Sequence, residues 1–354
     1  MRLLVLAPNW LGDAVMALPA IADLCRHYPG ATLTMAARRP LAALATMVPG
    51  VHDSLPLDGR GGAGAITALR RDIDRVRAGR FDAVLLLPNS FHAALLAHRA
   101  RIPQRWGYRA DLRTPLLTRA VSRPRIARLH QAEYYQHLTR GLGIAAGPLV
   151  AEVRVDEERG READRLLRQH GWDGRPLVGM APGAAYGWAK RWPPERMGGL
   201  AAALAYEAGA SVVIVGATAD RDTVDSVVHS AGGAAAGGGA IIDLAGKTDL
   251  PALAGVLSRC RAFVSNDSGA MHLAAAVDVP VVGIFGPTRE WATSPLAGPR
   301  GIQAAIVHTD VSCRPCMLRT CPIDHRCMTG IAVGDVIAPV LSALNRPAVR
   351  REAP

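Results

Sequence analysis

Polar residues that suit an anion site fill the stretch Ser265 to His272, which reads S-N-D-S-G-A-M-H. The stretch follows a short apolar run and precedes an alanine-rich helical pattern, so it predicts an elbow between a strand and a helix. Asn266, Asp267 and Ser268 are good N-cap residues, and Gly269 lets a ligand approach the backbone closely. The N–H groups and the dipole of the helix would face an anion placed there. An ordinary capped helix is the alternative interpretation.

A second candidate anion site is the stretch Ala181 to Pro193, which reads A-P-G-A-A-Y-G-W-A-K-R-W-P. It follows an apolar run and is rich in small residues, so its backbone N–H groups suit a phosphate while Lys190 supplies a compact charge. The only other lysine, Lys247, is expected to be a solvated loop residue. The fingerprint G-x-G-x-x-G is absent from this stretch, and Ile241 stands where a Walker motif ending at Gly246 to Thr248 needs glycine. The sequence therefore indicates neither a dinucleotide oxidoreductase nor a P-loop ATPase.

A carboxylate suited to acid–base chemistry lies near the amino terminus, in N-W-L-G-D at Asn9 to Asp13. Asp13 is expected at the start of the first helix, where it is a candidate general base. The alternative is that Asp13 only complements the helix dipole, an effect of about 0.3–1 kcal/mol. Trp10 is expected to be exposed just before this helix, which is unusual for a simple turn.

Four of the six cysteines are clustered in C-R-P-C-M-L-R-T-C-P-I-D-H-R-C, at Cys313, Cys316, Cys321 and Cys327. The first two have the C-x2-C spacing of half a zinc site, whereas the last two are spaced C-x5-C. A zinc site, a local disulfide and reduced packing cysteines are the three interpretations that the spacing leaves open. None of them makes the cluster catalytic.

The chain is basic, with a formal net charge of +11, which implies an anionic partner. Arginines crowd residues 99–128, with Trp106 and Tyr108 among them. Aromatic residues interleaved with arginine would permit RNA binding, but no recognised nucleic-acid module is legible. A phosphorylated acceptor or an anionic bilayer fits at least as well.

The elements that must position these groups alternate as apolar runs and helical patterns along 354 residues, of which 49% are hydrophobic. Such alternation predicts an α/β protein with parallel sheets covered on both faces. We expect two Rossmann-like doubly wound domains that face a central cleft, at residues 1–160 and 171–330. A charged helix at Glu157 to His170 would connect them, and a C-terminal helix within residues 331–354 would pack back on the first domain. A strand at Ala151 to Val155 would close the first sheet.

No segment approaches the roughly 18 uninterrupted apolar residues of a membrane span. The amino-terminal apolar run resembles that of a signal peptide, but Pro8, Asn9 and Asp13 interrupt it and leave it too short for that purpose. We therefore expect a cytoplasmic protein.

Several separated motifs occur in an order that resembles glycosyltransferase family 9, the heptosyltransferases. They are P-N-W-L-G-D, L-L-P-N-S-F, G-Y-R-A-D-L-R, P-G-A-A-Y-G-W-A-K-R-W-P, S-N-D-S-G-A-M-H-L-A-A-A and G-I-F-G-P-T. The resemblance covers nearly the whole chain, and the cysteine-rich segment favours the type II branch. It implies a GT-B fold in which the first domain binds the acceptor and the second binds ADP-heptose. The implied reaction transfers heptose, with inversion, to the first heptose of the lipopolysaccharide inner core.

The resemblance also implies roles for the residues that match the family's motifs. Asp13 would take a proton from the acceptor hydroxyl, and Lys190 would stabilise negative charge on departing ADP. Asp267 would lie at the donor sugar, and Asp220 would contact the ribose or the adenine. The further donor-binding residues implied are Ala184, Ala185, Tyr186, Ser268, Gly269 and His272, and the acceptor-binding residues are Trp10, Asn89, Ser90, Arg109 and Arg113.

The resemblance implies no cofactor and no metal, because Lys190 and a helix N-terminus would handle the diphosphate. The implied partners are ADP-heptose, a phosphorylated lipid A–Kdo–heptose acceptor and the anionic inner leaflet of the cytoplasmic membrane, with no nucleic acid. The enzyme would lie peripherally on the inner face of that membrane. The alternatives are heptosyltransferase I or another family 9 transferase with a different acceptor, a GT-B sugar-nucleotide epimerase, and a basic scaffold that binds RNA or membrane.

Overall fold

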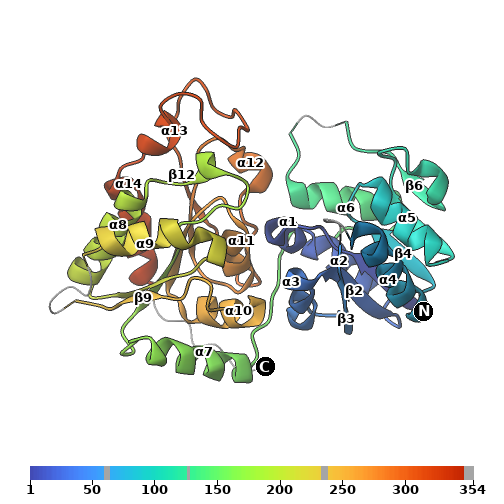
Figure 1. Cartoon of the computed structure of the whole chain (residues 1–354), viewed down its shortest axis with the longest axis horizontal. Coiled ribbons are helices and arrows are strands. Elements are labelled where there is room, and N and C mark those ends of the chain that lie inside the picture. Colours follow the sequence, from blue (N-terminus) through green and yellow to red (C-terminus); the bar gives the residue numbers. More distant parts are fainter. Residues whose placement is uncertain (60–63, 126–127, 233–237, 347–354) are drawn as a thin grey trace. The chain divides into compact units, whose positions relative to one another are not determined.

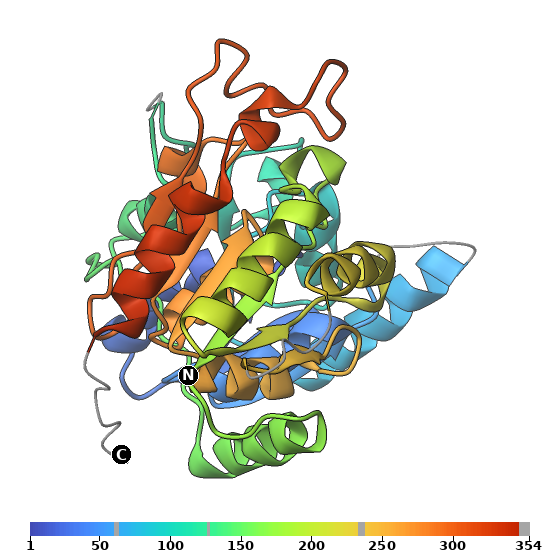
Figure 2. The same ribbon diagram turned by 90° about the vertical axis from the view of Figure 1, so that its left-hand side faces the viewer.

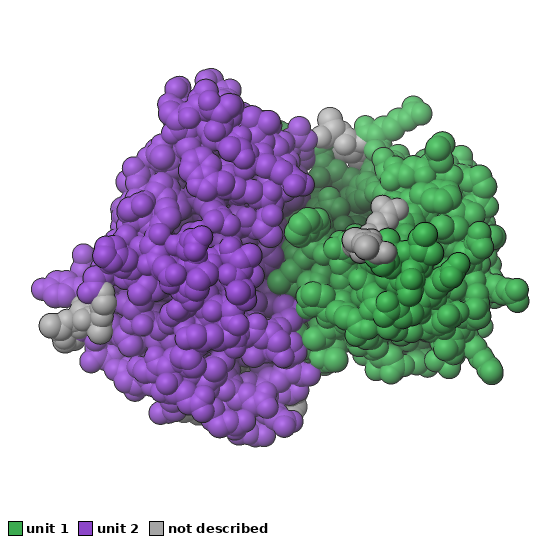
Figure 3. All heavy atoms as spheres, in the orientation of Figure 1, with its two compact units in different colours: residues 1–154 green, residues 155–354 purple. Residues whose placement is uncertain are grey.

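The computed structural model describes residues 1–59, 64–125, 128–232 and 238–346. The chain divides into two compact units, Met1–Arg154 and Val155–Pro354, which Figure 3 colours separately. Each unit is built on one six-stranded sheet whose neighbouring strands are parallel. The expected α/β architecture with two Rossmann-like sheets is therefore confirmed.

The first unit has the strand order β3-β2-β1-β4-β5-β6, which is that of a Rossmann fold. Its strands are β1 (Arg2–Leu6), β2 (Thr32–Arg38), β3 (Asp53–Leu57), β4 (Ala83–Leu86), β5 (Gln104–Tyr108) and β6 (Arg119–Val121). Its α-helices are α1 (Leu11–Met16), α2 (Leu18–His27), α3 (Arg39–Ala42), α4 (Ala65–Ala78), α5 (Phe91–Arg99) and α6 (Gln131–Gly141). Helices α1, α2 and α6 pack together, and α4 packs with α5 (Figure 1).

The second unit has the order β12-β11-β10-β7-β8-β9, which is the same topology read from the other edge. Its strands are β7 (Leu177–Ala181), β8 (Ser211–Ile214), β9 (Ile241–Asp243), β10 (Ala262–Asn266), β11 (Val281–Ile284) and β12 (Ala305–Val307). Its α-helices are α7 (Glu157–Gln169), α8 (Pro194–Glu207), α9 (Arg221–Ser230), α10 (Leu250–Arg259), α11 (Gly269–Ala276), α12 (Glu290–Thr293), α13 (Arg326–Thr329) and α14 (Val333–Leu344). Helices α8, α9 and α14 form one group, and α7, α10 and α11 form another.

The central strands of both sheets are buried along nearly their whole length. In β1 only Arg2 is exposed, and every residue of β4, β7 and β10 is buried. A strand covered by helices on both faces needs apolar side chains at successive positions, which is why these strands read as continuous apolar runs. The sequence pattern therefore identified them directly.

The C-terminal helix, which was expected to pack back on the first domain, contributes side chains to the core of the second unit. Helix α14 packs against α8 and β10 of the second unit, and Val336, Val340 and Ala343 join that unit's core. Their spacing defines an apolar stripe, but a stripe does not specify which sheet it will cover. Residues 347–354 of the predicted segment lie outside the described residues. The expected connector, α7, also belongs to the second unit, where it packs against α10.

The strand expected at Ala151 to Val155 does not form. This segment is irregular, with the Arg154 N–H donating to Met47 O at 2.8 Å. Instead β5 and β6 complete the first sheet, and β12 the second. Strand β5 reads Q-R-W-G-Y, and β6 and β12 have three residues each, so none gives the continuous apolar run of a buried strand. In the described part of the chain, no helix combines the length and apolarity needed to cross a bilayer.

Candidate active site

The candidate anion site of the second unit lies at the switch point of its sheet. Strands β7 and β10 are parallel neighbours, with Ala181 paired to Ser265. Consecutive strands run outward from this pair in opposite directions, so their carboxyl ends are where a ligand binds in open α/β sheets. Residues 182–192, here called the lysine turn, follow β7, and Asp267 follows β10. The two stretches that the sequence singled out therefore lie side by side, as predicted.

An ion pair between Lys190 and Asp267 joins these stretches. Lys190 Nζ lies 2.6 Å from Asp267 Oδ2, and the two side chains are only 12% and 5% exposed. Thr288, in the loop after β11, donates its hydroxyl to the same carboxylate oxygen at 2.7 Å. The ammonium also lies 4.8 Å from the centre of the Tyr186 ring, a cation–π distance. The lysine charge is therefore held at the switch point by Asp267 and Tyr186, and Thr288 binds the same Asp267 oxygen.

Asn266 fixes both ends of the lysine turn. Its side-chain carbonyl accepts the N–H of Trp192 at 3.0 Å, and its amide donates to Pro182 O at 2.7 Å. All of these atoms are buried, so the side chain replaces hydrogen bonds that water cannot supply. In the sequence Asn266 was only one of three candidate N-caps. No local pattern indicated its hydrogen bonds to Trp192 and Pro182, which lie 74 and 84 residues earlier in the chain.

The start of α11 is suited to an anion. Ser268 is its N-cap, yet its side chain does not bond the first-turn N–H groups; its hydroxyl lies 2.9 Å from that of Ser265. The helix begins at Gly269, and its N–H groups are therefore not occupied by a capping side chain. His272 lies one turn further on and is buried. The plain capped helix, which was the alternative interpretation of this stretch, does not match this geometry.

The remaining donor candidates lie on or beside the lysine turn. Ala184 is buried, Ala185 is exposed and Tyr186 is half-buried. A Cβ on Gly183 would lie 2.3 Å from the Asp220 carboxyl carbon, so that carboxylate closely approaches the turn. It accepts the Ala217 N–H at 3.1 Å and pairs with Arg191 at 3.2 Å. Asp220 is thus brought to the turn, but as the partner of Arg191, which the sequence analysis did not select.

The candidate base of the first unit also follows a central strand at a switch point. Strand β1 has β2 on one side and β4 on the other, and α1 begins directly after the loop that follows β1. Asp13 lies in the first turn of α1, and Trp10, its N-cap, is 58% exposed. Burial, and then the negative charge of Asp13, raise the pKa of Tyr135 on α6. Helix α1, which carries Asp13, packs against α6, which carries Tyr135.

Among the acceptor candidates of the first unit, some are exposed to solvent and others form hydrogen bonds within the unit. Arg109 is exposed at the end of β5, whereas Ser90 caps α5 by accepting the Ala93 N–H at 3.3 Å. Asn89, after β4, donates to the Tyr134 hydroxyl at 2.8 Å. These positions surround the carboxyl ends of β4 and β5, so the motifs that carry them lie at one edge of the sheet.

Arg113, which was expected to contact the acceptor, is fully buried. Its guanidinium donates to Tyr108 O at 2.9 Å, to Pro88 O and to the Asn89 side chain at 3.4 Å. Burial lowers the pKa of Arg113 to about 10. The residue ties the loop after β4 to the end of β5, and its solvated neighbours in sequence gave no sign of this burial.

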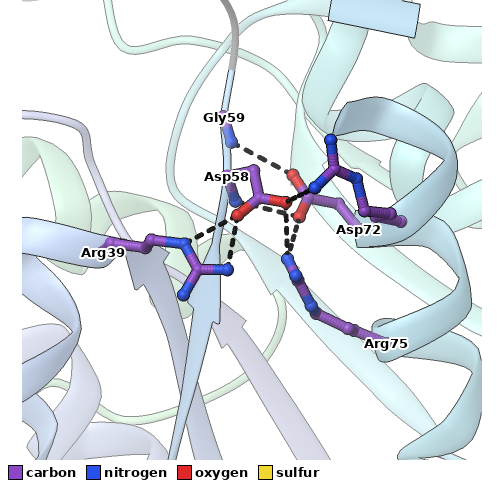
Figure 4. Close-up of polar contacts among 6 residues, drawn as sticks. Arg39, Asp58, Gly59, Asp72 and Arg75 are labelled. Atoms are coloured by element: carbon purple, nitrogen blue, oxygen red, sulfur yellow. Dashed lines mark hydrogen bonds and ion pairs between the residues drawn. The ribbon is translucent and has the colours of Figure 1, made fainter. Parts of the chain in front are cut away.

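A further charged cluster lies where β3 ends, shown in Figure 4. Asp58 accepts from Arg39 Nε at 2.7 Å, and Arg75 lies 2.9 Å from its other oxygen. Asp72 on α4 is buried and accepts the N–H groups of Asp58 and Gly59 at 2.9 and 3.1 Å, as well as Arg75 at 3.0 Å. The Arg39 hydrogen bond is the main cause that lowers the pKa of Asp58. The hydrogen bonds and ion pairs of this cluster hold the turn after β3 against α4.

The four clustered cysteines are all free thiols. Burial, followed by the charges of Cys313, Cys316 and Cys321, raises the pKa of Cys327 to about 11. Among residues 1–59, 64–125, 128–232 and 238–346, no three His, Cys, Asp or Glu side chains are arranged to hold a metal ion.

Comparisons with known proteins agree with this arrangement. The sequence model of "Glycosyltransferase family 9 (heptosyltransferase)" matches residues 68–326. The chain is 33% identical over 302 residues to lipopolysaccharide heptosyltransferase 2 of Salmonella typhimurium, covering 84% of this chain and 86% of that protein. It is 28% identical over 339 residues to lipopolysaccharide heptosyltransferase 1 of Pseudomonas aeruginosa, covering 91% and 87%. The structure of Escherichia coli ADP-heptose lps heptosyltransferase II superposes with a TM-score of 0.82 at 28% identity, covering 97% of this chain and 98% of that one.

Proposed function

The chain belongs to glycosyltransferase family 9, and we propose that it moves L-glycero-D-manno-heptose from ADP-heptose to the first heptose of the lipopolysaccharide inner core, with inversion. Membership of this family makes the chain a glycosyltransferase with a GT-B fold, so the non-enzyme scaffold is set aside. The observation that carries the proposal is the buried pair of Lys190 and Asp267 at the switch point of the second sheet. It supplies a fixed cation and a carboxylate where a sugar nucleotide would bind.

Lys190 and the N-terminus of α11 act on the diphosphate of the donor. As the bond between the anomeric carbon and the ADP oxygen breaks, the electron pair leaves with ADP and negative charge develops there. A preformed cation and oriented N–H groups stabilise that charge without reorganising at the moment of reaction. Asp267, Ser268, Gly269, His272, Asp220 and residues 184–186 complete the donor site. Asp267 accepts hydrogen bonds and is therefore suited to a sugar hydroxyl.

Asp13 is the general base on the acceptor side. It removes the proton from the acceptor hydroxyl while that oxygen attacks the anomeric carbon from the face opposite to ADP, which inverts the configuration. Asp13 comes from the first unit and Lys190 from the second, so the reaction draws one group from each unit. Trp10, Asn89, Ser90 and Arg109 serve the acceptor around Asp13. No metal and no cofactor is required, because Lys190 and the helix N-terminus provide the positive charge.

The acceptor is a phosphorylated lipid A–Kdo–heptose molecule, and we place the enzyme peripherally on the cytoplasmic face of the membrane that carries it. The net charge of +11 supports an anionic acceptor and an anionic lipid surface, and we propose no role for nucleic acid. The second candidate function is transfer by a type I enzyme, to an acceptor without heptose. It is favoured by the similarity to heptosyltransferase 1 of Pseudomonas aeruginosa.

A transfer assay with two acceptors tests the proposal. The protein is incubated with ADP-heptose and either an inner-core acceptor that carries one heptose or one that carries none. Product on the heptosylated acceptor alone supports type II transfer, and product only on the other acceptor means type I. The anomeric configuration of the product, read by nuclear magnetic resonance, tests inversion. No transfer to either acceptor, with ADP bound, would contradict both candidate functions.

A further inference from the structure

The cysteine-rich segment supports the candidate site rather than forming a site of its own. We call residues 313–327 the thiol segment; it joins β12 to α13 and appears in Figure 2 within the orange-red loops above the sheet of the second unit. Most of it is exposed. Near its start, Arg314 donates to Gly286 O at 2.7 Å and forms an ion pair with Glu290. The segment is therefore anchored beside the loop that carries Thr288.

The backbone of the thiol segment also contacts the lysine turn directly. Tyr186 donates its hydroxyl to Met317 O at 2.7 Å, and the Ala189 N–H donates to Arg319 O at 3.0 Å. A Cβ on Gly187 would lie 2.4 Å from Arg319 O, which is closer than two such atoms approach. Gly187 is therefore needed because another backbone passes so close to it.

His325 completes this contact by binding the carbonyl group of the same residue, Ala189. It is 5% exposed, and its Nε2 lies 2.7 Å from Ala189 O. Because a carbonyl only accepts, Nε2 carries the proton in this bond. The ring also packs on Trp188, with the ring centres 4.4 Å apart. The thiol segment thus binds both the N–H and the C=O of Ala189, the residue directly before Lys190.

The backbone of His325 is held in a conformation that few side chains favour. Its φ is +58°, in the left-handed region, at the N-cap of α13. A residue other than glycine is uncommon there, and such positions persist where the surroundings fix them. This backbone conformation directs the imidazole toward the lysine turn. Glycine would adopt the same φ more readily but has no imidazole to place there.

We propose that His325 is a positioning residue for the transfer reaction, acting through the Ala189 carbonyl to hold Lys190 in place against the diphosphate of the donor. This inference rests on the proposed function, since it assumes that Lys190 binds the donor. It assigns the thiol segment a part in the activity that does not depend on the chemistry of its cysteines. Loss of the imidazole donor would leave a carbonyl in the turn unpaired and free the turn to move.

Two variants separate the hydrogen bond from the ring. His325→Phe keeps an aromatic ring against Trp188 but has no donor, whereas His325→Gln keeps an N–H donor at about the same reach but has no ring. We expect His325→Phe to raise the dissociation constant for ADP and the KM for ADP-heptose about 10-fold, and to lower kcat. The KM for the acceptor should stay within about 2-fold, and His325→Gln should recover ADP affinity to within about 3-fold of wild type.

The control is Ile323→Ser, because Ile323 is an exposed residue of the same segment, and it should leave all these constants unchanged. ADP binding is measured by titration calorimetry on the folded full-length protein, with thermal unfolding recorded for every variant. A merely structural role would lower the unfolding temperature but leave the dissociation constant of the folded fraction unchanged, and that result overturns the proposal. Equal losses in His325→Gln and His325→Phe also overturn it. Failure of the wild-type protein to bind ADP would instead overturn the proposed function.

Discussion

At the scale of single residues, the candidate site depends on charges that the protein already partners. Lys190 is paired with Asp267, and Thr288 bonds the same carboxylate. A buried pair is costly to break by removing one partner, since the other charge is then left without compensation. The arrangement therefore holds the ammonium in a fixed position. In the proposed reaction, the donor diphosphate would accept hydrogen bonds from the N–H groups of Lys190 that do not bind Asp267.

Asp13→Asn should leave the affinity for ADP nearly intact but lower turnover by about 10²-fold or more. The amide is similar in size to the carboxylate but does not accept a proton at neutral pH, so only the chemical step loses its base. Steady-state rates with saturating donor and acceptor, together with ADP titration, measure the two effects. Normal turnover in this variant would remove Asp13 as the base.

Lys190→Ala should weaken ADP binding by about 10-fold or more and also slow transfer, because the cation interacts with the diphosphate before and during its departure. The sequence offers a matched control in its other lysine. Lys247 is exposed and bonds only locally, to Asp243 O at 2.9 Å, so Lys247→Ala should behave like the wild-type protein. Equal effects of the two substitutions would show that net charge, rather than position, is responsible.

At the scale of elements, the loops that carry the site are fixed by side chains from elsewhere in the chain. Asn266 holds the ends of the lysine turn, Arg113 holds the loop after β4, and Asp72 holds the turn after β3. Each of these residues is buried and bonds backbone groups rather than an exposed ligand. Functional loops at the carboxyl ends of strands have few contacts of their own, so such bonds determine their shape.

Asp72→Ala should destabilise the first unit by about 3 kcal/mol, since it leaves the N–H groups of Asp58 and Gly59 without their acceptor and removes one of the two carboxylates that pair with Arg75. Asp74, on the same helix, is 71% exposed and pairs only with Arg77, so Asp74→Ala should change stability by less than about 1 kcal/mol. Native-state hydrogen exchange reports the two units separately, and the loss should appear in amides of the first unit. Similar small effects of both substitutions would mean that the cluster is a solvated surface feature.

At the scale of the whole molecule, the same Rossmann topology occurs twice, and the candidate residues of the two copies differ in charge. In each unit the candidate residues follow the central strands: Asp13 after β1 and Asn89 after β4, Lys190 after β7 and Asp267 after β10. The ammonium of Lys190 follows the switch point of the second sheet, and the carboxylate of Asp13 follows that of the first. This division matches a reaction that needs a base for one substrate and a cation for the other.

Removal of divalent metal should leave the transfer rate within about 2-fold, because Lys190 and the N-terminus of α11 meet the developing charge of ADP. Rates are compared with and without excess EDTA, on protein whose bound metals have been measured by elemental analysis. Loss of activity in EDTA that added Mg²⁺ or Zn²⁺ restores would contradict this expectation.

Much of the candidate site was accessible to sequence analysis, because polar residues that interrupt apolar runs mark the ends of buried strands. Asp267 and Lys190 were selected in this way, and the structure brings them together. Thr288, Asn266 and His325 were not selected for their roles. Their bonds span 21, 74 and 136 residues of the chain, and no local pattern reports a partner at such separations.

The sequence by itself determined the α/β class, the two parallel sheets and the ends of their central strands, since a strand buried on both faces must be continuously apolar. The tertiary structure alone decided the short edge strands β6 and β12, the packing of α14 on the second sheet and the burial of Arg113. Edge strands need fewer apolar residues, an apolar stripe fits any complementary surface, and an arginine is buried only where carbonyl groups converge to accept its protons. Those conditions arise from residues that meet only in the folded chain.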